Sequence, residues 1–155
     1  MIGFLRGRVI EQTFESVMMD VNGVGYELCC STQTLDDLLF QGDAKQESQV
    51  WVFTHLREDA LALYGFSTPF EKKMFLSLLK VNGIGPKMAI KILSATQLSQ
   101  LVEMIDEGNV KGLSSLPKVG KKTAEQMILT LKGQLVLEES DSGKKAKAAG
   151  ANGVQ

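Results

Sequence analysis

The chain has 155 residues, of which 44% are hydrophobic and 23% charged, so its composition is that of a globular protein and excludes a disordered or collagen-like chain. No apolar run reaches the roughly 18 residues of a membrane-spanning helix, and the N-terminus lacks the regions of a signal peptide, which favours a cytoplasmic protein. The net charge of −1 conceals an acidic half, residues 1–66, and a basic half, residues 67–137. This division suggests a polyanionic partner for the basic half, with chance bias between two ordinary domains as the alternative.

Residues 1–66 are predicted to be rich in β-strands. Apolar runs predict five strands, over residues 2–12, 16–21, 25–30, 49–55 and 60–64. Asn22-Gly23 is typical of a two-residue hairpin, and Gly3 and Gly7 are expected to mark bulges in the first strand. A short helix is expected after the third strand, with an N-cap at Ser31-Thr32. Three strands, a helix and two strands are the element order of an OB-type barrel.

A polar tip separates the fourth and fifth strands. It contains Arg57, Glu58 and Asp59 and is expected to be a solvent-exposed turn. If the basic half binds a polyanion such as DNA, these carboxylates would repel its phosphates and hold strands apart at a branch point; a divalent-ion site and an ordinary solvated loop are the alternatives. The sequence shows no second carboxylate cluster for metal catalysis, and one histidine with two adjacent cysteines gives no basis for a zinc site. We expect no metal and no cofactor.

Residues 67–137 are predicted to form an all-α domain. Thr68 and Glu71 have the spacing of a capping box, and Pro69 stands at the first helical position. Further helices are expected over residues 86–93, 98–106, 110–114 and 121–135. Residues 138–155 are rich in Gly, Ala, Lys and Ser and are expected to be a flexible linker or tail.

A nine-residue pattern occurs twice in this basic half, 35 residues apart. Residues 81–89 (VNGIGPKMA) align with residues 116–124 (LPKVGKKTA). In both copies a tight turn leads to a glycine and then a helix, whose unpaired N–H groups and positive dipole end suit a phosphate oxygen. This is the helix-hairpin-helix pattern, which holds the DNA backbone without reading its sequence. The DNA-binding residues are predicted to be Asn82, Gly83, Gly85, Lys87, Lys118, Gly120, Lys121 and Lys122.

The second copy of the repeat has two unusual features. Lys118 stands where such hairpins usually have glycine, so it either strains the turn or adds a phosphate contact. Residues 120–123 (GKKT) end like an ATP-binding P-loop, but Lys122 replaces the Ser or Thr that would hold Mg²⁺. The chain is therefore not expected to hydrolyse ATP alone.

Together these segments resemble the RuvA family of Holliday-junction-binding proteins. The resemblance covers about residues 1–135 and is carried by residues 1–7, 23–27, 53–66, 82–87 and 120–125. It implies an α+β multidomain fold, with an OB-type β-barrel followed by an all-α domain that contains two helix-hairpin-helix motifs. Glu58 and Asp59 match the acidic pin of the family, which lies near the crossover and helps to separate strands.

The same resemblance implies function and partners. It implies a structure-specific subunit that binds four-way junction DNA in recombination, repair and the SOS response, as a homotetramer or as two stacked tetramers, an octamer. It implies no enzyme activity of its own, because the RuvB hexameric ATPase supplies the motor and the RuvC resolvase cleaves the junction. Family members continue into a third helical domain that contacts RuvB, whereas this sequence ends at Gln155. We expect junction binding without stimulation of RuvB.

Two other functions stay open from the residues alone. One is a generic helix-hairpin-helix module of a repair protein, with little preference for DNA structure. The other is a base-excision glycosylase, which would need a flipped-base pocket and a catalytic group such as Lys91 or Glu125.

Overall fold

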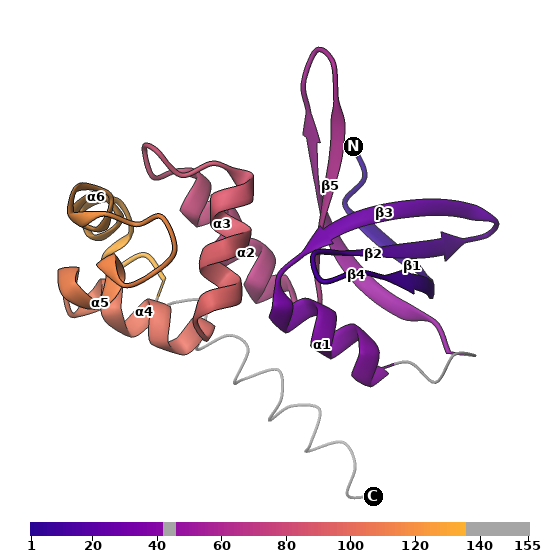
Figure 1. Ribbon diagram of the computed structural model, residues 1–155, viewed down its shortest axis with the longest axis horizontal. Coiled ribbons are helices and arrows are strands. Elements are labelled where there is room, and N and C mark those ends of the chain that lie inside the picture. The colour runs from indigo at the N-terminus through magenta and orange to yellow at the C-terminus, as the bar shows by residue number, and fades with distance from the viewer. Residues whose placement is uncertain (42–45, 136–155) are drawn as a thin grey trace, which may run out of the picture.

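The computed structural model describes residues 1–41 and 46–135 and shows a closed five-stranded barrel followed by a helical half (Figure 1). The elements are β1 (Phe4–Gln12), β2 (Ser16–Val21), β3 (Val24–Cys30), α1 (Thr32–Gln41), β4 (Ser48–Leu56), β5 (Leu61–Phe66), α2 (Pro69–Leu79), α3 (Pro86–Ala95), α4 (Leu98–Asp106), α5 (Val110–Ser114) and α6 (Lys121–Leu131). The strands close in the order β1-β2-β3-β5-β4, and the β3–β5 pair is parallel while the others are antiparallel. This confirms the predicted fold class. No helix of the described residues is long and apolar enough to cross a bilayer.

Apolar side chains at alternate positions of the strands fill the interior of the barrel. Successive side chains of a strand point to opposite faces, so residues two apart, such as Val50 and Val52 in β4, both point inward and are buried. Leu35 and Leu38 of α1 pack against the same interior. The buried set is Leu5, Val17, Met19, Leu28, Cys30, Leu35, Leu38, Val50, Val52 and Leu63.

The predicted bulge positions in the first strand are wrong. The register of β1 against β2 shifts between Val9 and Glu11, beyond both glycines. Gly7 has another role, because a Cβ there would lie 2.3 Å from the carbonyl oxygen of Asp20 on β2. Glycine at this position therefore permits close approach of two strands and does not mark a bulge.

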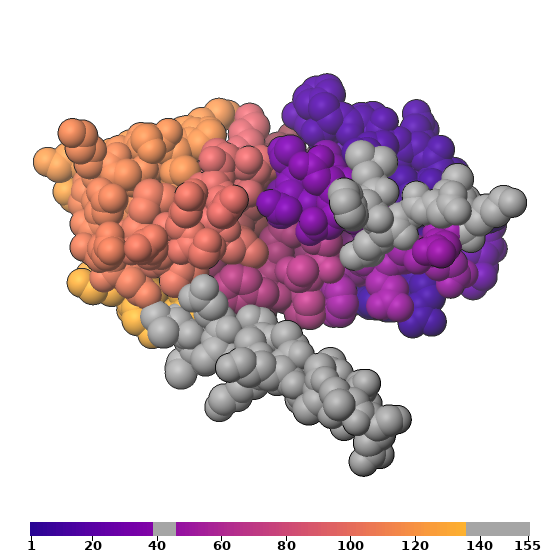
Figure 2. Space-filling model, turned by 90° about the horizontal axis from the view of Figure 1, so that it is seen from below, coloured from indigo at the N-terminus to yellow at the C-terminus, as the bar shows by residue number. Residues whose placement is uncertain are grey.

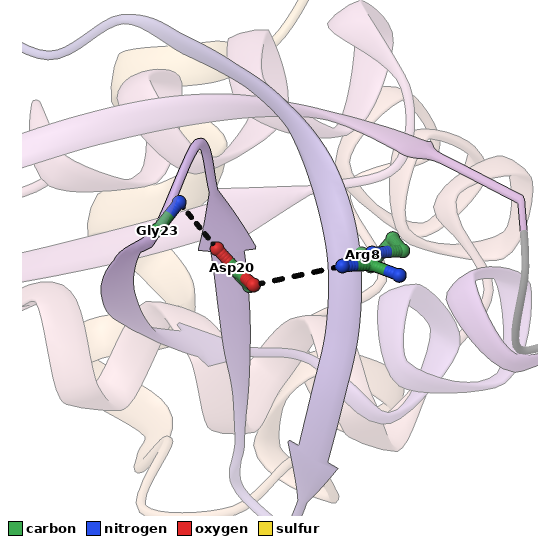
Figure 3. Close-up of polar contacts among 3 residues, drawn as sticks. All are labelled: Arg8, Asp20 and Gly23. Atoms are coloured by element: carbon green, nitrogen blue, oxygen red, sulfur yellow. Dashed lines mark hydrogen bonds and ion pairs between the residues drawn. The ribbon is translucent and has the colours of Figure 1, made fainter.

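The Asn22-Gly23 hairpin prediction is confirmed. Asn22 and Gly23 adopt φ values of 52° and 88° between β2 and β3, as a primed two-residue turn requires. The backbone N–H of Gly23 donates to Oδ1 of Asp20 at 2.7 Å, and Oδ2 of the same carboxylate lies 3.8 Å from a terminal nitrogen of Arg8 (Figure 3). Asp20 thus fixes the turn and pairs with the neighbouring strand.

The helical half shares its hydrophobic core with the last barrel strand. Phe75 of α2 packs against Tyr64 and Phe66 of β5, with ring centroids 5.4 Å and 4.9 Å away. A second contact between the two halves joins α1 to α3, where the N–H of Thr32 donates to Oγ of Ser94 at 3.0 Å. Figure 2 shows α1, in violet, at this boundary between the barrel and the helical half. The barrel therefore provides a packed support for α2 and α3.

The capping box of α2 forms only in part. Oγ1 of Thr68 accepts the N–H of Glu71 at 3.1 Å, and Pro69 occupies the first turn, as predicted. The Glu71 carboxylate, however, turns to the start of α1, where it accepts hydrogen bonds from the hydroxyls of Ser31 and Thr34. It is only 2% exposed, and this burial is the main reason why the pKa of Glu71 is raised.

The last helix is shorter than predicted. We expected it to extend to Leu135, but α6 ends at Leu131. Lys132 leaves the helical conformation and Gly133 adopts a φ of 81°. A positive φ at glycine just after a helix is a common stop signal. The predicted tail, residues 138–155, lies outside the described residues.

Candidate nucleic-acid interface

The two copies of the repeat form two hairpins with matching backbone hydrogen bonds. In the first, between α2 and α3, the N–H of Ile84 donates to the carbonyl of Val81 at 3.1 Å. In the second, between α5 and α6, the N–H of Val119 donates to the carbonyl of Leu116 at 3.2 Å. All four side chains are buried. The core therefore holds both turns in the same conformation.

The helices after the hairpins begin in the same way. Gly85 is the N-cap of α3 with φ −95° and ψ 176°, and Gly120 is the N-cap of α6 with φ −88° and ψ 177°. Neither helix has a side-chain cap or an acidic residue in its first turn, whereas α2 and α5 are capped by the side chains of Thr68 and Asn109. The first N–H groups of α3 and α6 are thus left for water or an anion.

Neither N-cap glycine is required by the protein's own backbone. The φ angles of Gly85 and Gly120 are ordinary for any residue, and a Cβ built at either position meets nothing within 4 Å. The space beside these glycines opens to solvent. A missing side chain at an exposed helix N-terminus lets an external group approach the backbone closely.

All eight predicted DNA-binding residues are exposed. The structure places four on each hairpin: Asn82, Gly83, Gly85 and Lys87 on the first, and Lys118, Gly120, Lys121 and Lys122 on the second. Among residues 1–41 and 46–135, the ion pair within 4.0 Å is Arg8 with Asp20, so no described carboxylate neutralises these lysines at that distance. Their positive charge is available to a ligand.

Lys118 adopts a left-handed backbone conformation. Its φ is 60°, and the equivalent residue of the first hairpin, Gly83, has a φ of 95°. A side chain in this region costs roughly 1–2 kcal/mol relative to glycine. The second hairpin therefore keeps the turn geometry of the first in spite of the substitution, and the lysine side chain is exposed beside Gly120.

The acidic tip is a tight exposed turn at the end of the β4–β5 hairpin. The N–H of Arg57 donates to the carbonyl of Ala60 at 2.8 Å, and Glu58 and Asp59 are exposed at the end of the turn. In Figure 1 the β4–β5 hairpin rises from the barrel on the same side as the loop between α2 and α3. No group of three or more His, Cys, Asp or Glu residues suited to a metal ion occurs in the described part of the chain.

Two cavities adjoin the first hairpin, and they bring together residues that the sequence did not connect; His55 and Pro117 among them were not predicted as site residues. The larger, of about 600 Å³, lies between the barrel and α3 and is lined by Lys87 and Lys91 and by Pro117 of the second hairpin. The smaller, of about 400 Å³, is lined by Gly85 and Lys87 together with His55 and Arg57 of the β4–β5 hairpin. No local pattern indicates this juxtaposition, because the two segments are distant along the chain.

The structure does not assemble the alternative catalytic groups. Lys91 lines the larger cavity, and Glu125 is an exposed residue of α6 that is not among the described residues lining it. A glycosylase needs both an enclosed pocket for the flipped base and a catalytic group inside it. The geometry offers exposed lysines and helix N-termini, which are suited to the DNA backbone.

Comparisons with known proteins agree with this geometry. The family model described as "RuvA N terminal domain" matches residues 1–65, and the model described as "SAM-like Helix-hairpin-helix tandem" matches residues 75–132. A "Holliday junction branch migration complex subunit RuvA" from Bdellovibrio bacteriovorus is 58% identical over 149 residues, which are 96% of this chain and 75% of that protein. Proteins of the same name from Neisseria meningitidis and Anoxybacillus flavithermus are 45% and 49% identical, over 98% and 87% of this chain and 77% and 66% of their own lengths.

Proposed function

This chain belongs to the RuvA family, and on that premise we propose that it is the DNA-binding subunit that recognises four-way junctions in a Holliday junction branch migration complex. The observation that carries the proposal is the pair of equivalent hairpins, each with an uncapped glycine N-terminus and exposed lysines. We assign no catalytic step to the chain itself.

Each hairpin would hold one stretch of DNA backbone. Phosphate oxygens accept hydrogen bonds from the free N–H groups at the start of α3 and α6, and the helix dipole favours their negative charge. Lys87 beside the first hairpin, and Lys121 and Lys122 beside the second, add ionic contacts. None of these groups reads a base edge, so the grip depends on the path of the backbone and not on its sequence.

The acidic tip would supply the preference for a junction. Glu58 and Asp59 place negative charge at an exposed turn beside a phosphate-binding surface. A continuous duplex brings phosphates towards this charge, whereas the centre of an open junction leaves room for it. Repulsion would thus disfavour continuous duplex and keep the strands at the crossover apart.

The assembly and its partners belong to the same proposal. We propose a homotetramer, or two stacked tetramers, on the open junction, with the RuvB ATPase as the motor and the RuvC resolvase acting on the same DNA. The family membership also supports a role in recombination, repair and the SOS response in the cytoplasm.

A binding titration tests the proposed function. The chain is titrated against an immobile four-way junction and against a duplex of the same sequences, at several salt concentrations. We expect tighter binding to the junction and an affinity that falls steeply with salt, with a slope of about −0.9 in log K against log salt per phosphate neutralised. Lys87→Ala and Lys122→Ala should each make that slope shallower, and Lys111→Ala, an exposed lysine of α5, is the control.

Two results would contradict the proposal. Equal affinity for junction and duplex would favour the generic helix-hairpin-helix module instead. An affinity independent of salt would exclude the phosphate grip itself.

A further inference from the structure

The smaller cavity joins the acidic-tip hairpin to the first helix-hairpin-helix motif. Its wall on the barrel side includes His55, Arg57 and Tyr64, and its wall on the helical side includes Gly85 and Lys87. It measures about 400 Å³ and lies at the start of α3, where the helix has no side-chain cap. Two cationic side chains and a positive helix end therefore surround one space, a combination that favours an anion.

Arg57 is oriented by a neighbour. Its Nε–H donates to Nε2 of His55 at 2.8 Å, which requires that Nε2 is unprotonated. Nε is used in this bond, and among residues 1–41 and 46–135 no hydrogen bond or ion pair engages the two terminal nitrogens of the guanidinium. Arginine binds phosphate best with two such N–H groups in parallel, so the His55 contact presents the group in a form ready to bind.

The charges that surround Arg57 lie on both sides of it. Glu58 and Asp59 follow it at the exposed end of the turn, and Lys87 shares the cavity. Burial raises the pKa of Tyr64, and the positive charge of Arg57 opposes that rise, which agrees with a guanidinium close to this cavity wall. Arg57 therefore lies between the acidic side chains of the tip and the basic side chain of the first hairpin.

We propose that Arg57 binds a DNA backbone phosphate in this cavity, beside the phosphate grip of Gly85 and Lys87, and that His55 is a positioning residue for it. The inference rests on the proposed function, which places the acidic tip near the crossover. A strand that bends away at the crossover can enter the cavity, whereas a continuous duplex meets Glu58 and Asp59 first. Arg57 would therefore add affinity for the junction more than for duplex.

Charge-matched variants test this site. Junction and duplex affinities are measured against salt for the wild type, for Arg57→Gln and for Arg6→Gln, which removes an exposed arginine elsewhere on the barrel. We expect Arg57→Gln to lower junction affinity about tenfold, as the removal of one charge-assisted hydrogen-bond pair implies, and Arg6→Gln to change it little. The salt slope on the junction should become shallower by about 0.9 for each phosphate that Arg57 no longer neutralises.

Variants of His55 test its positioning role. His55→Leu removes the acceptor and should lower junction affinity about threefold, because the Arg57 guanidinium is then no longer held in the orientation that presents its terminal nitrogens to the phosphate. His55→Gln places an amide oxygen near the position of Nε2 and should restore most of the affinity. In the Arg57→Gln background, His55→Leu should have no further effect, since His55 acts through Arg57. Thermal unfolding confirms that each variant is folded.

The outcomes separate the inference from the proposed function. If the wild type shows no junction preference, the proposed function fails. If the wild type prefers the junction while Arg57→Gln behaves like Arg6→Gln, the phosphate site is overturned and the proposed function stands. An equal decrease of affinity in His55→Leu and His55→Gln would overturn the positioning role.

Discussion

At Lys118 the backbone conformation favours glycine, whereas DNA binding favours a positive charge. Its φ of 60° favours glycine, whereas its exposed ammonium group lies beside the N-terminus of α6 and favours DNA. We predict that Lys118→Gly raises the free energy of unfolding by about 1 kcal/mol relative to Lys118→Ala, because alanine keeps the strained conformation. Both variants should bind the junction more weakly than the wild type, since neither has the ammonium group for a phosphate. Urea unfolding and junction titration measure the two effects.

Lys121 provides a control at which the glycine variant should be less stable than the alanine variant, the opposite of the order expected at Lys118. It lies in the first turn of α6 with helical geometry. Glycine in a helix is less favourable than alanine by up to about 1 kcal/mol, so Lys121→Gly should be less stable than Lys121→Ala. The same order of stability at both lysines would contradict backbone strain at Lys118.

A second prediction concerns Glu71, which links α2 to the start of α1. Burial raises the pKa of this carboxyl above its ordinary value of 4.5, although hydrogen bonds from Ser31 and Thr34 lower it in part. The folded protein then holds the proton more tightly than the unfolded chain does. The contribution of Glu71 to the free energy of unfolding is therefore largest below its ordinary pKa and is lost as the pH rises through the raised value.

This pH dependence is measured by comparison with a variant that cannot titrate. Urea unfolding of the wild type and of Glu71→Gln is followed between about pH 4 and pH 7. We expect the wild type to lose stability relative to Glu71→Gln as the pH rises. Glu125→Gln, at an exposed carboxylate of α6, is the control. A difference between wild type and Glu71→Gln that stays constant with pH would contradict the prediction.

At the scale of elements, the two hairpin helices depend on the glycines that precede them. A Cβ at Gly85 or Gly120 meets no protein atom within 4 Å, so alanine there should change the free energy of unfolding by less than about 1 kcal/mol. On the DNA side the added methyl group would stand between the helix N-terminus and the phosphate. We predict that Gly85→Ala and Gly120→Ala each lower junction affinity about tenfold, as expected when a charge-assisted hydrogen bond is removed.

Gly3 supplies the matched control for these variants. It also has open space around a built Cβ and no positive φ, but it belongs to the barrel, before β1. Gly3→Ala should leave junction affinity unchanged. Unchanged affinity in Gly85→Ala and Gly120→Ala as well would show that backbone approach at these positions is unimportant.

Local signals explain which elements could be predicted from the sequence. The Asn22-Gly23 turn and the N-cap at Thr68 depend on residues within four positions of each other, and both form. The side-chain direction of Glu71 could not be predicted, because its partner Ser31 lies 40 residues away. The place of Arg57 beside the first hairpin could not be predicted either, because Arg57 and Gly85 are distant along the chain and line one cavity only in the folded protein.

At the scale of the whole molecule, the positive and negative surfaces are held in a fixed relation. Phe75 packs against Phe66 and Tyr64, and the Glu71 network joins α2 to α1, so the barrel with its acidic tip and the helical half with its lysines share one packed boundary. The protein can distinguish DNA structures by charge only if its acidic and basic surfaces keep a fixed position relative to each other. The shared core therefore connects the stability of the fold to discrimination between DNA structures.

The acidic tip should determine how strongly the protein prefers a junction over duplex DNA. In Glu58→Gln combined with Asp59→Asn, the turn keeps its size and loses two negative charges. We expect duplex affinity to rise severalfold and junction affinity to change less, because repulsion acts mainly on phosphates that pass directly over the tip. The ratio of the two affinities should therefore fall, and most strongly at low salt. The matched control is Glu103→Gln with Glu107→Gln, two exposed carboxylates of the helical half, which should not alter that ratio. A ratio unchanged in the tip variant would mean that the turn is only a connection between β4 and β5, and that junction preference comes from the spacing of the hairpins alone.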